Sequence, residues 1–197
     1  MFFKTATYDI MYLRAIDVAQ RIYAGVEMER DCQEYTVEDI SRSVIEYSIT
    51  HKMPITNLRL QRLLYFLQGF RLLETKGRNG LFKESVLAWP NGPVVRESYF
   101  LFDRFGSEPI TDYISASTLK FENGRFRFVD TRWTNPLSSR DKEFISKVVE
   151  GFSSISDSRL VGISRDPQGP WAKNYQPNES NIVPRKEIYN YFIEKTK

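Results

Sequence analysis

Cysteine and histidine are almost missing from this sequence of 197 residues, which contains one Cys and one His. A single cysteine cannot form an internal disulfide, so nothing in the sequence calls for an oxidising compartment. With Cys32 and His51 as the only soft ligands, one chain cannot assemble a structural zinc site of the Cys/His type. No glycine-rich phosphate-binding motif is present either. We therefore expect no metal and no cofactor.

Catalytic motifs are scarce as well. His51 is the one candidate imidazole base, and its expected place at the end of a helix suits the helix dipole instead. No nucleophile-elbow motif accompanies it, and Cys32 has no Cys-x-x-Cys partner. Carboxylate pairs such as Glu38/Asp39 have the pattern of a solvated face, although an oxygen-ligand cation site has no fixed spacing and stays an alternative. We expect a protein that is not an enzyme.

The sequence also has little excess of charge of either sign and no long apolar segment. The 28 Lys and Arg against 25 Asp and Glu give a net charge of +3, and the basic residues are scattered. A nucleic-acid-binding protein needs a more concentrated positive field. The longest apolar stretch, 63–67, is far shorter than the roughly 20 residues of a membrane span, and no apolar segment follows Met1–Lys4 as in a signal peptide. We expect a cytoplasmic protein without membrane or nucleic-acid partners.

The spacing of the apolar residues predicts a mainly α (α+β) fold. We expect one compact helical domain with a central apolar helix and a small β-hairpin or short sheet. The helical patterns cover 7–24, 36–50, 56–76, 93–105 and 140–152, short segments surround Leu160 and Trp171, and a final helix begins at Pro184.

The segment 56–76 has the strongest helical pattern. Thr56 can cap it, and its apolar positions recur at helical spacing, with further ones widening the apolar surface: Leu58, Leu60, Leu63, Leu64, Phe66, Leu67, Phe70 and Leu73. A helix that is apolar on so much of its circumference belongs at the centre of a core. On the two neighbouring helical segments we expect these residues to be buried: Val37, Ile40, Val44, Ile45, Ile49, Val94, Tyr99, Phe102 and Phe105. Pro93 is placed in the first turn of its helix.

A β-hairpin is predicted at Phe121–Phe126, because its central Asn-Gly pair favours a type I′ turn. That turn pairs Glu122 with Arg125 and Phe121 with Phe126. Since a lone hairpin is marginally stable in water, we expect its phenylalanine face to pack on the helices.

The opposite face of the hairpin carries Lys120, Arg125 and Arg127. A basic β-ribbon can enter a DNA groove, but Glu122 opposes these cations, so a solvated face is favoured. The tryptophans Trp89, Trp133 and Trp171 lie near turns, where they either pack or contact a partner. Because Trp, Tyr and Arg are enriched in interface hot spots, the candidate partner-binding residues are Trp89, Arg96, Tyr99, Arg125 and Arg127.

The stretch 55–69, with the sequence ITNLRLQRLLYFLQG, resembles the signature helix of the Panacea domain, also called the SocA-like antitoxin domain. The resemblance continues through Leu81-Phe82, Ala88-Trp89, the NGPVV of 91–95 and Pro170-Trp171, and covers about residues 40–175. The matching signature residues are Thr56, Leu60, Gln61, Leu63, Leu64, Tyr65, Gly69, Trp89, Gly92, Pro93, Val94 and Trp171. Family members carry a Thr-His dipeptide where this chain has Ile163-Ser164-Arg165.

The resemblance implies an antitoxin of a bacterial or phage toxin–antitoxin system that neutralises a cognate toxin by direct protein–protein binding. It also implies an alternative, a proteolytic adaptor that delivers a toxin to an AAA+ protease. A phage-encoded enzyme or nucleic-acid-binding regulator is the alternative from another class. We expect a variable N-terminal helical extension over 1–40 packed on the core, the Panacea domain over 41–176 and a C-terminal helix over 177–197. Most signature residues are core or turn formers, so their substitution should destabilise the fold. The oligomeric state stays open.

Overall fold

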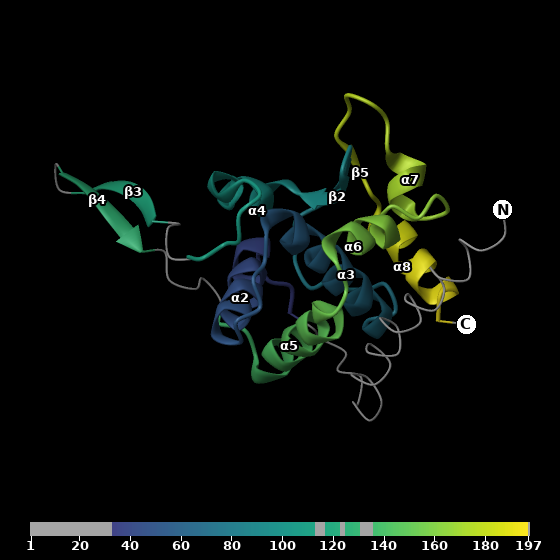
Figure 1. Cartoon of the computed structure of the whole chain (residues 1–197), viewed down its shortest axis with the longest axis horizontal. Helices are drawn as coiled ribbons and strands as arrows, with labels where there is room; N and C mark the ends of the chain where they lie inside the picture. The colour runs from purple at the N-terminus through teal and green to yellow at the C-terminus, as the bar shows by residue number, and fades with distance from the viewer. Residues whose placement is uncertain (1–32, 113–116, 123–124, 131–135, 197) are drawn as a thin grey trace.

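The computed structural model describes residues 33–112, 117–122, 125–130 and 136–196, and its helices surround one central helix (Figure 1). The helical elements are α2 (Val37–Thr50), α3 (Asn57–Glu74), α4 (Arg96–Leu101), the 3-10 turn η1 (Asp103–Phe105), α5 (Ser139–Ser153), α6 (Asp157–Ser164), α7 (Pro170–Asn174) and α8 (Arg185–Glu194). The strands are β1 (Val86–Trp89), β2 (Gly92–Val95), β3 (Ser117–Glu122), β4 (Arg125–Asp130) and β5 (Asn181–Ile182). The predicted mainly α (α+β) fold is confirmed.

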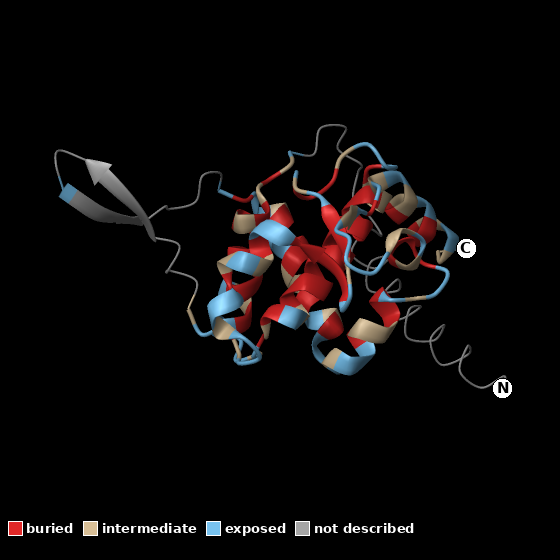
Figure 2. Ribbon diagram, turned by 90° about the horizontal axis from the view of Figure 1, so that it is seen from above, coloured by how far each residue is buried: buried red, intermediate tan, exposed pale blue. Residues whose placement is uncertain are grey.

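Helix α3 is the centre of the core, as its apolar pattern predicts. The hydroxyl of Thr56 caps it by accepting a hydrogen bond from Arg59 N at 3.1 Å. Helices α2, α5, α6 and α8 and strand β2 all contact α3, and Figure 2 shows the buried residues concentrated in the middle of the helical body. A helix enclosed in this way has no single apolar face, so polar as well as apolar side chains of α3 are buried.

Two residues expected in the core are partly exposed instead. Ile49 lies in the last turn of α2 with 42% of its surface exposed, and Leu58 lies in the first turn of α3 with 39% exposed. Terminal turns have fewer neighbours that can enclose a side chain, and the apolar spacing alone does not report this. The other apolar positions predicted to be buried on these two helices are buried, apart from the partly exposed Leu73.

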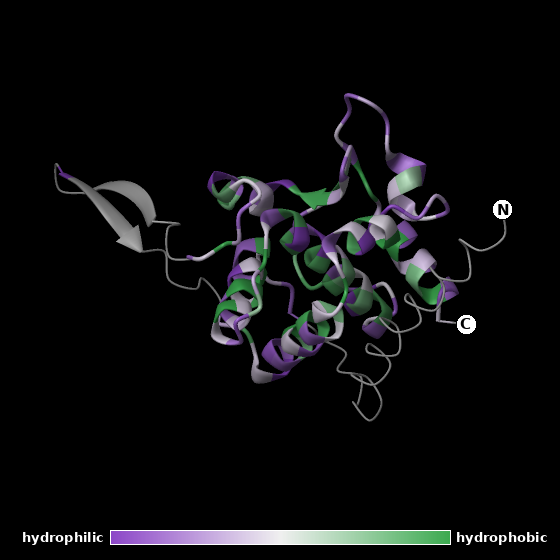
Figure 3. Ribbon diagram, viewed as in Figure 1, coloured by the Kyte–Doolittle hydropathy of each residue, from purple (hydrophilic) through white to green (hydrophobic). Residues whose placement is uncertain are grey.

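The segment after β1 differs from the prediction. Pro93 does not begin a helix, because Gly92–Val95 form β2, which pairs with β1 so that Ala88 lies opposite Pro93. The three-stranded antiparallel sheet has the order β2-β1-β5, and α4 begins only at Arg96. Proline lacks the N–H of a central strand but is tolerated in an edge strand, which β2 is. Figure 3 shows the hydrophobic residues of β2, where the β-branched Val94 and Val95 favour an extended backbone. Val94 and Phe102 are buried as expected, whereas Tyr99 and Phe105 are half-buried.

The hairpin of β3 and β4 has the predicted register, with Phe121 opposite Phe126 and Glu122 opposite Arg125. We expected it to pack on the helices, but Figure 1 shows its strands standing clear of the helical body. Helices α2, α4, α5, α6 and α8 and strand β2 already contact α3, so the core forms without the hairpin.

The predicted segments near Leu160 and Trp171 form α6 and α7, and Pro184 immediately precedes α8, which packs on α3. The predicted helix over 7–24, Cys32 and Trp133 lie outside the described residues, so the N-terminal extension stays a prediction. Over the ranges that the structure describes, no helix has the length and apolar character needed to cross a bilayer.

Candidate functional site

Two buried polar side chains of α3 hold the turn between β1 and β2. Gln61 Oε1 accepts a hydrogen bond from Val95 N at 2.9 Å, and the guanidinium of Arg62 donates to the carbonyl oxygens of Asn91 and Pro93. Gln61 is 1% exposed and Arg62 is 0% exposed. The signature helix and the NGPVV segment therefore form one unit, because the helix supplies the donors and acceptor that the turn and strand backbone need.

The turn requires glycine at position 92. Gly92 has a φ of +117°, which side-chain-bearing residues rarely adopt, and a Cβ there would lie 2.9 Å from Arg62 Cζ. The backbone can therefore approach the guanidinium closely enough to surround it with carbonyl groups. This contact links the glycine of the turn to the arginine of the central helix.

Most other residues of the signature stretch on α3 are also enclosed by the fold, and Gln68 and Tyr65 are examples. Gln68 Oε1 accepts from Leu81 N at 2.7 Å, and Gln68 Nε2 donates to Phe82 O at 3.1 Å, which fixes the chain after α3. Burial raises the pKa of the Tyr65 hydroxyl. The following signature residues are buried: Leu60, Leu63, Leu64, Tyr65 and Gly69.

An aromatic cluster lies beside the β1–β2 turn. The ring of Trp89 is 5.2 Å from that of Tyr99 and 6.1 Å from that of Phe100, and the two α4 rings are 5.6 Å apart. Phe100 is 60% exposed, although an aromatic side chain gains most from burial. Asn57 Nδ2 donates to Tyr99 O at 2.9 Å and so ties α4 to the signature helix. We call Trp89, Tyr99 and Phe100 the aromatic face.

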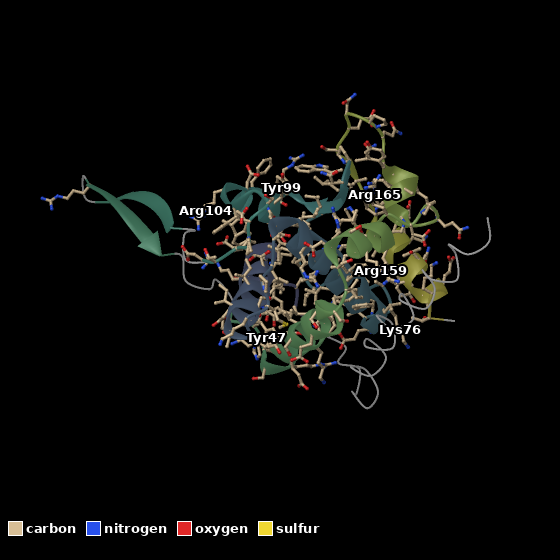
Figure 4. The ribbon with its side chains drawn as sticks, in the orientation of Figure 1. Tyr47, Lys76, Tyr99, Arg104, Arg159 and Arg165 are labelled. Carbon is tan, nitrogen blue, oxygen red and sulfur yellow. The ribbon has the colours of Figure 1, made fainter. Side chains whose placement is uncertain are left out.

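Two arginines, Arg62 and Arg165, lie near the same turn. Trp171 Nε1 donates to Trp89 O at 2.9 Å, and the guanidinium carbon of Arg165 lies 4.7 Å from the centre of the Trp171 ring. Burial, and then the positive charge of Arg165, lowers the pKa of Arg62 to about 10. Figure 4 shows Tyr99 and Arg165 on the same side of the molecule as β2.

The five candidate partner-binding residues do not form one surface. Trp89 and Tyr99 are in contact, and Arg96 is exposed at the start of the same helix as Tyr99. Arg125 is exposed at the start of β4, on the hairpin that stands apart, and the side chain of Arg127 lies outside the described part.

Sequence reasoning missed three residues of this region: Phe100, Arg62 and Arg165. The available signal for Phe100 was its place directly after Tyr99, a candidate partner-binding residue. Hydrophobic periodicity gives no signal for Arg62, because it does not distinguish a buried polar residue of a helix from an exposed one.

A second polar cluster lies in the core. Tyr35 Oη donates to Asp141 Oδ2 at 2.6 Å, and Arg71 pairs with both Asp141 and Glu74. Burial raises the pKa of Asp141, but the attraction of Arg71 and the hydrogen bonds from Tyr35, Arg71 and Ser138 outweigh it, so the pKa lies below its usual value. These groups connect α3, α5 and the segment just before α2, and Tyr35, Arg71 and Asp141 are buried, which indicates a stabilising role.

His51 ends α2, as predicted, and stacks on Tyr47 with ring centres 3.9 Å apart. Its Nδ1 lies 2.8 Å from Tyr47 O, a contact that satisfies a carbonyl of the last helical turn. Within 33–112, 117–122, 125–130 and 136–196, no group of three or more His, Cys, Asp or Glu side chains is arranged to hold a metal ion.

Comparison with known proteins places this geometry in a family. The family model described as "Antitoxin SocA-like, Panacea domain" matches residues 60–172, which include the signature helix, the turn and Trp171. The chain is 31% identical over 149 residues to "Antitoxin SocA" of Caulobacter vibrioides (strain NA1000 / CB15N). The aligned segment covers 73% of this chain and 72% of the relative. No solved structure matches the chain. The chain belongs to the SocA-like Panacea domain family.

Proposed function

We propose that this protein is an antitoxin of a bacterial or phage toxin–antitoxin system and that it neutralises a cognate toxin by direct protein–protein binding, without catalysis. Membership of the Panacea family and the 31% identity to a protein named "Antitoxin SocA" support the antitoxin role. The observation that carries the binding role is the aromatic face, since Phe100 exposes 60% of its surface beside Trp89 and Tyr99.

The aromatic face suits a protein partner for physical reasons. Trp and Tyr bury large areas with few rotatable bonds and therefore dominate many interface hot spots. Here they lie on β1 and α4. Asn57 fixes α4 to the central helix, and Gln61 fixes β2, which pairs with β1, so little ordering is needed on binding. Arg96, exposed in the first turn of α4, is placed at the edge of the proposed interface.

The domain organisation is proposed on the same basis. Residues 41–176 form the toxin-binding Panacea domain, 1–40 form a variable extension, and 177–197 close the core through α8. The proposed toxin-binding surface then lies within the segment that the family model matches, since Trp89, Tyr99 and Phe100 fall inside 60–172.

The test is co-expression with the product of the adjacent gene. Wild-type protein should restore growth and co-purify with that product. Phe100→Ala should weaken both effects while Ile49→Ala, a matched loss of an exposed apolar side chain on α2, should not. The absence of both growth rescue and a complex with wild-type protein would refute the proposal.

The abundance of the toxin separates direct neutralisation from the adaptor alternative. Direct binding leaves the amount of toxin unchanged on co-expression, whereas an adaptor lowers it in cells that contain the AAA+ protease and not in cells that lack it. Salt-sensitive binding of DNA that is lost in an Arg125→Ala, Arg127→Ala variant would favour the nucleic-acid alternative instead.

A further inference from the structure

We propose that Arg165, supported by Trp171 and by the buried Arg62, binds a carboxylate of the toxin at the β1–β2 turn. This inference rests on the proposed antitoxin function and names the chemistry of its partner. It extends the aromatic face by a charged contact that the sequence did not predict.

The geometry leaves Arg165 available for such a contact. Its side chain is exposed at the end of α6, and the guanidinium lies over the Trp171 ring at 4.7 Å. A guanidinium that stacks on an aromatic ring keeps its N–H groups at the edge, where two parallel hydrogen bonds to one carboxylate form. Trp171 therefore orients the group before a partner arrives.

The positive charge at this turn is not neutralised by the described part of the chain. Arg62 donates to carbonyl oxygens and Arg165 contacts a ring, and no described carboxylate forms an ion pair with either. The adjacent carboxylate, Asp166, accepts a hydrogen bond from Tyr191 at 2.7 Å and pairs with Lys195 at 3.2 Å. The carboxylate of Asp166 is therefore held by residues of α8 and its C-terminal cap.

Unsatisfied donors accompany this charge. Arg62 Nε and Trp89 Nε1 are buried, and among the described groups neither has a hydrogen-bond acceptor. A carboxylate paired with Arg165 would offset the repulsion between the guanidinium groups of Arg165 and Arg62.

A protein carboxylate fits the surroundings better than the phosphates of a nucleic acid. The aromatic face lies next to the turn and offers apolar area to a protein surface. Glu97 and Asp103 are exposed on α4 and η1, where their negative charge disfavours an extended polyanion. An acidic side chain among apolar residues of the toxin meets both conditions.

Affinity measurements on the complex with the adjacent-gene product test the proposal. In low salt, Arg165→Ala should raise the Kd about 10- to 100-fold, and the affinity of the variant should depend less on salt than that of wild type. The matched control is Arg159→Ala, because Arg159 is also an exposed arginine on α6, and Figure 4 shows it nearer Lys76 than Tyr99. Its Kd should change less than about twofold.

The stability of the free variant separates a binding role from a structural one. Removing one of two neighbouring positive charges should leave the melting temperature of Arg165→Ala unchanged or slightly raised. A lower melting temperature together with weaker binding would assign Arg165 to the fold and overturn the inference.

A charge swap identifies the partner group. Among acid-to-arginine variants of the toxin, one should restore binding to Arg165→Glu. Wild-type Kd and salt dependence in Arg165→Ala would overturn this inference and leave the antitoxin function standing, whereas a wild-type protein that forms no complex would overturn both. Loss of duplex-DNA binding in Arg165→Ala, with toxin binding intact, would replace the carboxylate by phosphate.

Discussion

The ring of Phe192 packs directly against the Cα of Gly69, so that a Cβ at this position would overlap the ring. Glycine inside a helix is less favourable than alanine by about 1 kcal/mol. Here it lets α8 approach α3, and Phe192 gains contacts with aromatic rings of the central helix at 5.6, 6.2 and 5.4 Å, those of Tyr65, Phe66 and Phe70. The last helix is therefore part of the core.

Gly69→Ala should lower the free energy of unfolding by about 1–3 kcal/mol, because overpacking against a buried ring outweighs the better helix propensity of alanine. Urea unfolding at neutral pH measures the change. The double variant Gly69→Ala, Phe192→Leu should lose less free energy of unfolding than the sum of the losses in the two single variants. The smaller leucine side chain makes room for the added methyl group. Additive losses would mean that the two residues do not compete for the same space.

Gly92→Ala should destabilise the protein by about 2–5 kcal/mol, because both the positive φ and the close guanidinium of Arg62 oppose a Cβ. Gly106→Ala is the matched control: its φ is +55°, but nothing lies within 4 Å of the added Cβ, so a loss of about 1–2 kcal/mol is expected. Thermal or urea unfolding of the two variants gives the comparison. Equal losses in the two variants would show that backbone strain alone, without the contact to Arg62, accounts for the need for glycine at position 92.

Asp141→Asn should lower the free energy of unfolding by about 2–4 kcal/mol, because it removes one of the two carboxylates that pair with the buried Arg71 and alters the acceptor of the Tyr35 hydroxyl. Urea unfolding at pH 7 checks the size. Lys147→Ala is a suitable control, since its ion pair with Glu143 is exposed and its loss should have no measurable effect on unfolding.

The same carboxylate predicts a pH dependence. The folded-state pKa of Asp141 lies below the value of about 3.9 for an unfolded chain, so its contribution is complete above about pH 4. It is lost as the pH falls through the folded-state pKa. Below about pH 4, the stability of wild type should therefore fall more steeply than that of Asp141→Asn. Parallel curves would show that Asp141 is not lowered in the folded protein.

How far the sequence predicted this molecule depends on the range over which each signal acts. Helix α3 was predicted because its apolar spacing and the Thr56 cap are local, and the hairpin register followed from one Asn-Gly pair. Pro93 was misplaced because a proline after a turn suits both a helix start and an edge strand. The choice was made by pairing of β2 with β1, which in turn pairs with β5 through Leu87 and Ile182.

The candidate site was less predictable than the fold. Trp89 and Tyr99 were chosen by residue type, and the structure brings them together. The partners of Arg62 and the stacking of Arg165 on Trp171 join residues about 30 and 6 positions apart through turns whose geometry no local pattern encodes. Hydrophobic periodicity also gives no signal for buried polar residues, and Gln61 and Arg62 are buried because the turn backbone requires them.

Core and surface positions of the matched segment should separate in their effects on stability and binding. Leu64 is 0% exposed, so Leu64→Ala should cost about 3–5 kcal/mol of stability and lose growth rescue only because less folded protein remains. Phe100→Ala should change the stability by less than about 0.5 kcal/mol, since Phe100 is 60% exposed, and yet weaken the complex about 10-fold or more. Circular dichroism melts and affinity measurements on the same preparations distinguish the two. A Leu64→Ala protein that stays fully folded and loses binding would place the toxin contact in the core of the signature helix and not on the aromatic face.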